Sequence, residues 1–300
     1  MAEGRVIVNQ RRQFLVEDNN GDRIRCIVKG RKLLPVAGDR VQWVALDDDV
    51  GLIRHIHDRR NTLCRYDVRR GKQPLAANLD QLLVVTASQP ALDIFMLDKY
   101  LVAAAASGIE AIIVFNKIDL LDSVSSEETN KLLAEYATLG HQTIQVSVQS
   151  NTGLEEFSRL LTNKLSALIG ASGVGKSSLV NWLLPDAAVR IADLSTARDE
   201  GRHTTTSSQL YPLPFGGDLV DSPGVRDFML WPMPVAELKD YFIEFQGVAE
   251  HCKYSDCTHV AEPDCAVQKA VQEGRLLTRR HDSYRGMVRI MQAQYEAKQL

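Results

Sequence analysis

The stretch LSALIGASGVGKSSLVNWLL, residues 165–184, decides the fold. An apolar run leads into a loop of the pattern G-x-x-x-x-G-K-[ST], which opens a helical segment. This order predicts a phosphate-binding loop, because the glycines let backbone N–H groups face phosphates and the helix N-terminus adds partial positive charge. We expect Lys176 to reach the β- and γ-phosphates and the Ser177 hydroxyl to bind Mg²⁺. The residues expected around the phosphates are Gly170, Ser172, Gly173, Val174, Gly175, Lys176, Ser177 and Ser178.

A second motif, N-K-I-D at 116–119, follows the apolar run AIIVF. Alone, such a tetrapeptide is more simply a surface helix cap, but together with the phosphate loop it predicts guanine recognition. The Asp119 carboxylate can accept hydrogen bonds from guanine N1–H and the 2-amino group, and adenine offers neither donor. Asn116 is expected to meet the purine edge and Lys117 to pack on the base plane. Ser147, in QVSVQSNTG, is expected to donate a backbone N–H to guanine O6.

Two downstream segments are expected to contact the γ-phosphate and its Mg²⁺. Asp221-Ser-Pro-Gly224 follows the run DLV and matches D-x-x-G, for which the alternative is a strand-ending turn. Asp221 is expected to meet Mg²⁺ through water and the Gly224 N–H to meet the γ-phosphate. GRHTTT, residues 201–206, lies where a γ-phosphate-sensing switch belongs, and Thr205 is the expected Mg²⁺ ligand.

The water-orienting residue is not the usual one. Many hydrolysing relatives carry glutamine directly after D-x-x-G, and this chain has Val225, whose apolar side chain cannot orient water. His203 is the nearest candidate, since a neutral imidazole can accept a hydrogen bond from the attacking water. The alternative is that His203 only contacts phosphate or stiffens the switch. The predicted catalytic residues are therefore His203, Thr205 and Lys176.

The chain reads as a multidomain α/β protein. Short β-rich runs from 6 to 57, with a hairpin signal at Asn20-Gly21, predict a five-stranded barrel of the OB type. Strands and helices then alternate, which predicts a mostly parallel sheet with helices on both faces. Because the base motif precedes the phosphate loop, the GTPase domain is circularly permuted. The predicted division is an OB-fold domain at 1–60, a linker at 61–77, a GTPase domain at 78–230 and a helical zinc-binding domain at 231–300.

The C-terminal region contains three closely spaced cysteines and a histidine. The spacing C-x4-C-x-H-x5-C joins Cys252, Cys257, His259 and Cys265, and three thiolates with one imidazole suit tetrahedral Zn²⁺. Scattered free cysteines are the alternative, and His251 is a possible competing ligand. The sequence contains no C-x-x-C motif, so a redox-active cysteine pair is not indicated. One structural zinc ion is therefore expected, ordering a short polar stretch that has little core of its own.

Composition limits the class of protein. The 300 residues are 45% hydrophobic, yet no run approaches the roughly 20 apolar residues of a membrane span. The N-terminus lacks the apolar core of a signal peptide, so we expect a cytoplasmic protein that binds no membrane. The net charge of -3 argues against a uniformly cationic nucleic-acid binder. Two segments are nevertheless basic, with eight Lys/Arg against four acids in 1–32 and seven against two in 54–72. They are either a phosphate-backbone footprint or solvated faces.

Taken together, G-A-S-G-V-G-K-S-S-L-V-N, N-K-I-D, G-R-H-T-T-T, D-S-P-G and C-x4-C-x-H-x5-C resemble the motifs of the RsgA (YjeQ) family of bacterial GTPases over essentially the whole chain. The resemblance implies a cytoplasmic monomer that binds the maturing 30S subunit late in assembly, alongside other small-subunit assembly factors. It also implies contact with 16S rRNA through the OB-fold and zinc domains, and GTP hydrolysis that the subunit accelerates. Val225 and His203 fit the family pattern. We expect half of the arginines at 275, 279, 280, 285 and 289 to contact RNA.

Two other functions remain open on the sequence. One is an RNA-binding assembly scaffold that binds GTP for structural order alone, with Val225 marking lost catalysis. The other is a GTP-dependent kinase or transferase, but no acceptor-binding motif supports it.

Overall fold

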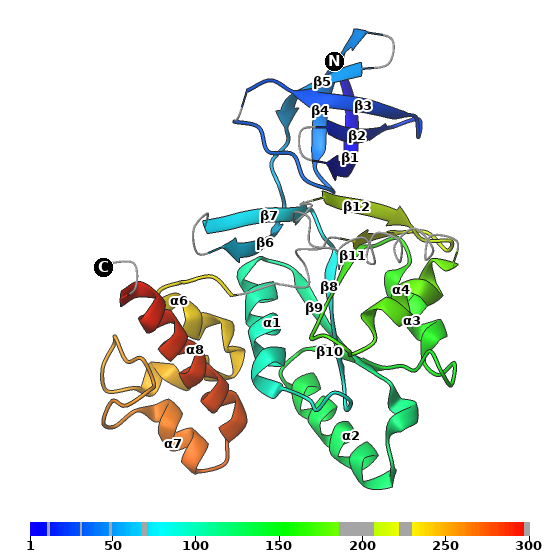
Figure 1. Ribbon diagram of the computed structural model, residues 1–300. Helices are drawn as coiled ribbons and strands as arrows, with labels where there is room; N and C mark the ends of the chain where they lie inside the picture. The colour runs from blue at the N-terminus through cyan, green and yellow to red at the C-terminus, as the bar shows by residue number, and fades with distance from the viewer. Residues whose placement is uncertain are drawn as a thin grey trace.

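The computed structural model describes residues 1–10, 13–30, 32–47, 50–67, 71–185, 207–221 and 230–296. Figure 1 shows a barrel at the N-terminus, a central sheet with its helices, and a helical region beside helix α1 at the C-terminus. Within these ranges, no helix is both long enough and apolar enough to cross a membrane.

The N-terminal region is the predicted five-stranded barrel. Its strands are β1 (Ala2–Gln10), β2 (Gln13–Asp18), β3 (Arg23–Val28), β4 (Arg40–Asp47) and β5 (Val50–Ile56). They are ordered β1-β2-β3-β5-β4, and β4 pairs back onto β1, which closes the barrel. The pairing of β3 with β5 is parallel, and the others are antiparallel. Alternate residues point inward, and the buried apolar core consists of Val6, Phe14, Val16, Cys26, Val41 and Ile53.

The central sheet is the predicted, mostly parallel one. Its strands are β8 (Gln81–Ala87), β9 (Glu110–Asn116), β10 (Gln142–Gln145), β11 (Leu165–Ile169), β12 (Ser207–Pro212) and β13 (Asp218–Asp221). The order is β10-β9-β8-β11-β13-β12, and only β12 runs antiparallel to its neighbour. The helices of this region are α1 (Ile94–Ala106), α2 (Ser123–Thr138), α3 (Leu154–Leu161) and α4 (Lys176–Leu183), with a short 3-10 turn η1 at Ile118–Leu120.

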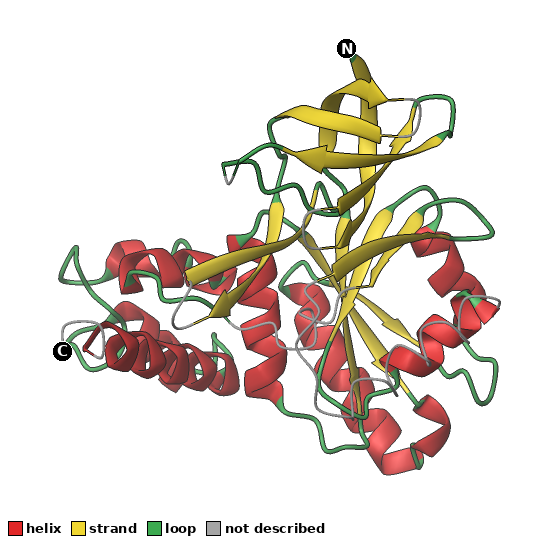
Figure 2. Ribbon diagram, turned by 45° about the horizontal axis from the view of Figure 1, so that its top comes forward, coloured by secondary structure: helices red, strands yellow, loops and turns green. Residues whose placement is uncertain are grey.

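Helices cover both faces of this sheet, as Figure 2 shows. Strand β8 is buried at every residue. Leu82 and Val84 belong to the apolar cluster that contains α1 and α2, whereas Leu83 and Val85 belong to the cluster that contains α3 and α4. A strand buried on both faces has no polar alternation, which is why Leu82 to Val85 form an unbroken apolar run.

The barrel and the central sheet form one continuous sheet of 11 strands, joined where β1 pairs antiparallel with β12. In this pairing Asn9 lies opposite Ser208. An ion pair reinforces the junction, with 2.6 Å between Arg5 Nη1 and Asp218 Oδ2. Residues assigned above to a linker form a separate hairpin of β6 (Thr62–Asp67) and β7 (Gly71–Ala77), between the barrel and α1 (Figure 1).

The C-terminal region is helical. Its elements are α6 (Val235–Leu238), η3 (Lys239–Tyr241), η4 (Ile243–Phe245), η5 (Ala249–His251), α7 (Ala266–Gln272) and α8 (Thr278–Glu296). Figure 1 shows α8 beside α1. Most of the buried apolar side chains of this region belong to the same cluster as those of α1, so the two regions share a core.

Candidate nucleotide and metal sites

The glycine-rich loop connects the end of β11 to the start of α4. Gly175 caps α4 with a φ of 94°, and a Cβ there would lie 2.2 Å from Asn116 Nδ2, so only glycine fits. Lys176 Nζ donates to the carbonyl oxygens of Gly170 at 2.7 Å and Ala171 at 2.6 Å, which places the ammonium group against the loop. Among the other predicted phosphate contacts, Val174 is buried, whereas the following are exposed: Ser172, Gly173, Ser177 and Ser178.

The base motif is hydrogen-bonded directly to the phosphate loop. Asn116 ends β9, is 2% exposed and donates from Nδ2 to the Val174 carbonyl at 2.9 Å. Lys117 has a left-handed backbone, with a φ of 62°, and Nζ donates to the Gly173 carbonyl at 2.6 Å. The two motifs, far apart in the sequence, therefore form one site at the carboxyl ends of β9 and β11.

Ser147 holds the carboxylate that is predicted to read guanine. Its buried hydroxyl donates to Asp119 Oδ1 and accepts a hydrogen bond from the Ser150 N–H at 3.1 Å. Asp119 lies on η1 and is exposed, so the side chain is oriented and still accessible to a ligand. The sequence predicted only a backbone role for Ser147, and the structure adds this side-chain role.

One contact in this site belongs to none of the motifs. The Gln89 carbonyl, in the loop between β8 and α1, accepts a hydrogen bond from Lys117 Nζ at 2.9 Å. Because a backbone carbonyl makes the contact, the side chain at position 89 gives little indication of it in the sequence. The position after a buried parallel strand was the only available clue, since ligands bind at that edge of such sheets.

The described part of the γ-phosphate region is limited. Asp221 ends β13, the parallel neighbour of the strand that leads into the phosphate loop. The antiparallel strand β12 begins at Ser207, directly after the segment predicted to be a switch. His203, Thr205 and Gly224 lie outside the described residues, as does Val225.

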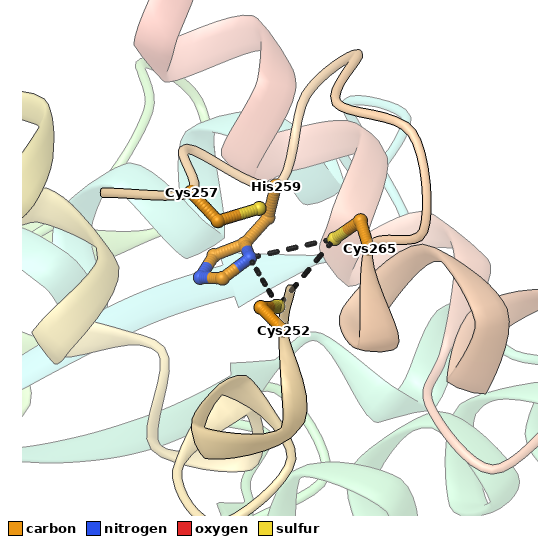
Figure 3. A group of neighbouring side chains, drawn as sticks. All are labelled: Cys252, Cys257, His259 and Cys265. Carbon is orange, nitrogen blue, oxygen red and sulfur yellow. Dashed lines mark hydrogen bonds between the residues drawn. The ribbon is translucent and has the colours of Figure 1, made fainter. Parts of the chain in front are cut away.

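The four predicted metal ligands come together in the C-terminal region (Figure 3). The ligand atoms of Cys252, Cys257, His259 and Cys265 all lie within 4.8 Å of one another. His259 Nδ1 is 3.5 Å from Cys252 Sγ and 3.5 Å from Cys265 Sγ, and those two sulfur atoms are 3.9 Å apart. His251 is not part of this group among the described residues.

These distances fit zinc. With Zn–S bonds of about 2.3 Å and a Zn–N bond of about 2.1 Å, a tetrahedral site separates two sulfurs by about 3.8 Å and sulfur from nitrogen by about 3.6 Å. The histidine is 1% exposed, and its Nε2 has no hydrogen-bond partner among the described residues. Burial raises the pKa of the Cys257 thiol to about 12 in the absence of metal. Binding of a divalent cation therefore releases protons from the cysteines.

Several predicted RNA-contacting cations are engaged inside the protein. Arg5 pairs with Asp218, and Arg59 pairs with the fully buried Asp39 at 2.7 Å. Arg280, one of the five arginines of which half are expected to contact RNA, is 2% exposed, so it is not among the cations available on the surface. The exposed cations of the barrel and its connection to β6 include Arg25, Lys29, Lys32, Arg40, Arg54 and Arg60.

Comparison with known proteins gives one consistent result. The family model described as RsgA GTPase matches residues 56–231. The chain is 40% identical to the small ribosomal subunit biogenesis GTPase RsgA of Pseudomonas aeruginosa, over 96% of this chain and 85% of that protein. It is 42% identical to the protein of the same name in Chromohalobacter salexigens, over 95% and 85%.

Two solved structures share the whole architecture. YjeQ from Thermotoga maritima superposes with a TM-score of 0.80 at 32% identity, covering 97% of this chain and 98% of that one. YloQ, described as a circularly permuted GTPase, superposes with a TM-score of 0.76 at 29% identity, covering 98% and 96%. The chain is therefore a member of the RsgA family of circularly permuted GTPases.

Proposed function

We propose that this protein is a GTP hydrolase that binds the small ribosomal subunit and acts in its late maturation. The observation that carries the nucleotide part is the pair of hydrogen bonds from Asn116 and Lys117 to carbonyls of the phosphate loop. Because of these bonds, a carboxylate suited to guanine and a loop suited to phosphates belong to one site. The family relationship and the name of the curated relatives support the ribosomal part.

In the proposed reaction, water attacks the γ-phosphate in line with the leaving GDP. Lys176 stabilises negative charge on the β- and γ-phosphates, and Ser177, Thr205 and Asp221 would hold Mg²⁺, which would neutralise further charge there. His203 orients the attacking water, in the absence of a glutamine after D-x-x-G. Gly224 donates its N–H to the γ-phosphate.

The exposed cations on the barrel and the zinc-binding region bind 16S rRNA on the 30S subunit, and this contact stimulates hydrolysis. The protein works as a cytoplasmic monomer alongside other small-subunit assembly factors. The division into 1–60, 61–77, 78–230 and 231–300 belongs to the same proposal.

The decisive experiment measures GTP and ATP turnover by the zinc-loaded protein, with and without purified 30S subunits, at low and moderate salt. We expect a large stimulation confined to GTP that weakens as salt rises, because phosphate contacts release counterions. Negligible turnover despite tight GTP binding, with or without subunits, would instead support the nucleotide-ordered scaffold.

A second comparison tests His203. His203→Ala should lower the stimulated rate about 100-fold while GDP affinity stays within threefold, since general base and orienting groups contribute roughly that much. His251→Ala serves as the matched control, because its side chain is outside the zinc group among the described residues. An unchanged stimulated rate in His203→Ala would assign water orientation to another group or to the partner.

A further inference from the structure

One turn of helix α8 faces two different parts of the protein. Arg280, His281 and Tyr284 are 2%, 6% and 0% exposed. Arg280 contacts the GTPase region, whereas the other two contact the zinc-binding loop. This turn of α8 therefore connects helix α1 of the GTPase region with the loop that carries the predicted zinc ligands.

On the GTPase side, Arg280 forms a buried ion cluster. Its Nη1 lies 2.5 Å from Asp98 Oδ1 on α1, and its Nε lies 2.6 Å from Glu244 Oε1 on η4. The Tyr136 hydroxyl on α2 donates to the same Asp98 oxygen at 2.7 Å. The guanidinium group of Arg280 lies over the Phe242 ring, with 4.6 Å between Cζ and the ring centroid. Asp98 is 0% exposed, so without Arg280 its carboxylate would be a buried, unpaired charge.

The same turn also contacts the backbone of the loop that carries the predicted zinc ligands, residues 252–265. His281 Nε2 donates to the His259 carbonyl at 2.8 Å, and the Tyr284 hydroxyl donates to the Thr258 carbonyl at 2.6 Å. Phe245 packs edge-on against the His259 ring, with centroids 5.9 Å apart. The zinc-ligating histidine is therefore fixed by groups that lie next to the ion cluster.

Helix α1 continues this chain of contacts to the nucleotide site. It is capped by Asp93, which accepts a hydrogen bond from the Met96 N–H at 3.0 Å. The first turn of α1 lines a small apolar cavity together with Ala171 and Val174 of the phosphate loop. Asp98 lies in the next turn, on the same helix.

We propose that Arg280 is a positioning residue that locks the zinc centre to helix α1, and so makes metal occupancy and nucleotide binding interdependent. The route runs from the zinc loop through His281 and Tyr284 to Arg280, then through Asp98 to the helix whose first turn supports the phosphate loop. This goes beyond the proposed function, because it assigns the zinc ion an effect inside the GTPase domain and needs no ribosome.

The first test follows zinc release from the full-length, zinc-loaded protein to a chromogenic chelator. Arg280→Gln and Asp98→Asn should each accelerate release about tenfold or more, although Asp98 contacts no zinc ligand. Asp98→Asn keeps the volume and the acceptor oxygen for Tyr136 but removes the negative charge that pairs with Arg280, so it reports even if Arg280→Gln folds poorly. Arg285→Gln, whose partner Asp282 lies on the same helix, is the matched control and should stay within twofold.

The double variant should release zinc no faster than the faster single variant, because both substitutions break the same pair. Native-like release from Asp98→Asn would overturn the proposal. So would a double variant whose acceleration is the product of the two single effects.

The second test measures dissociation of a fluorescent GDP analogue before and after zinc removal. In the native protein, zinc removal should speed dissociation at least threefold, because loss of the ion frees the contacts through which α8 holds helix α1 beside the phosphate loop. In Asp98→Asn, zinc removal should have a smaller effect, because Arg280 no longer pairs with a charged carboxylate on α1. Equal dissociation from native protein with and without zinc would refute the coupling. Failure of the native protein to bind GDP at all would contradict the proposed function. The zinc-release test would still show whether Arg280 holds the zinc centre to helix α1.

Discussion

Replacing Gly175 with alanine should disconnect the phosphate loop from the base motif. The residue has a φ of 94°, and a Cβ would lie 2.2 Å from Asn116 Nδ2. The left-handed backbone costs an alanine roughly 1–2 kcal/mol. Displacing Asn116 also breaks its hydrogen bond to Val174, which contributes about 1 kcal/mol. The total is about 2–3 kcal/mol, which corresponds to roughly 30- to 150-fold weaker GDP binding.

Titration of the purified variant with fluorescent GDP measures this loss. Gly173→Ala is the matched control, because its φ of 83° carries the same backbone cost while its Cβ would make only ordinary contacts with the Pro90 ring, at 3.4 Å and 3.8 Å. Its affinity should fall less, by about 5- to 30-fold. In an Asn116→Ala background the two alanine substitutions should become equivalent. Equal losses for Gly173→Ala and Gly175→Ala in the native background would refute the steric argument.

Three other predictions test separate parts of the molecule. Asp119→Asn should weaken GDP binding at least about 100-fold, since charged hydrogen bonds contribute about 1.5–3 kcal/mol each, and calorimetry with GDP and ADP should show the guanine preference disappear. Asp39→Ala should lower the free energy of unfolding by about 3 kcal/mol, because it leaves Arg59 without its partner at 2.7 Å; urea unfolding with Arg23→Ala as an exposed control measures this. Burial opposes ionisation of Glu262, but hydrogen bonds from Thr258 and the backbone lower its pKa to about 2 from 4.5. The native protein should therefore be more stable than Glu262→Gln by the full amount above about pH 4.5, and this difference should disappear as pH falls toward about 2. Melting temperatures of the two proteins that differ equally at all pH values would contradict it.

Local sequence patterns predicted the elements of the fold well. The Asn20-Gly21 signal marks the β2–β3 hairpin, where Gly21 has a φ of 86°. The mostly apolar run at 82–87 is a strand buried on both faces. These predictions succeeded because turn type and strand burial depend on residues that are adjacent in the sequence. The phosphate loop and the base motif could be placed for the same reason, since each follows a recognisable buried strand.

Long-range pairings could not be predicted in this way. Nothing near Asn9 signals that Ser208 will lie opposite it, so the junction between β1 and β12 was unforeseen. The β6–β7 hairpin was assigned only to a polar, basic linker, and Pro74 within it argues against a strand. Arg280 was one of five arginines of which half were expected to contact RNA, and nothing near it in the sequence signals its acidic partners, Asp98 and Glu244. In each case the deciding contact is tertiary.

The junction between β1 and β12 also protects the protein against self-association. An edge strand presents unpaired N–H and C=O groups that can recruit a strand from another molecule. In this fold the central sheet would end at β12, but β1 covers that edge with backbone pairs from Val8 to Gln10. The barrel, being closed, exposes little edge of its own. A GTPase region cut free of its barrel would thus expose the edge of β12, and we expect it to self-associate through that strand.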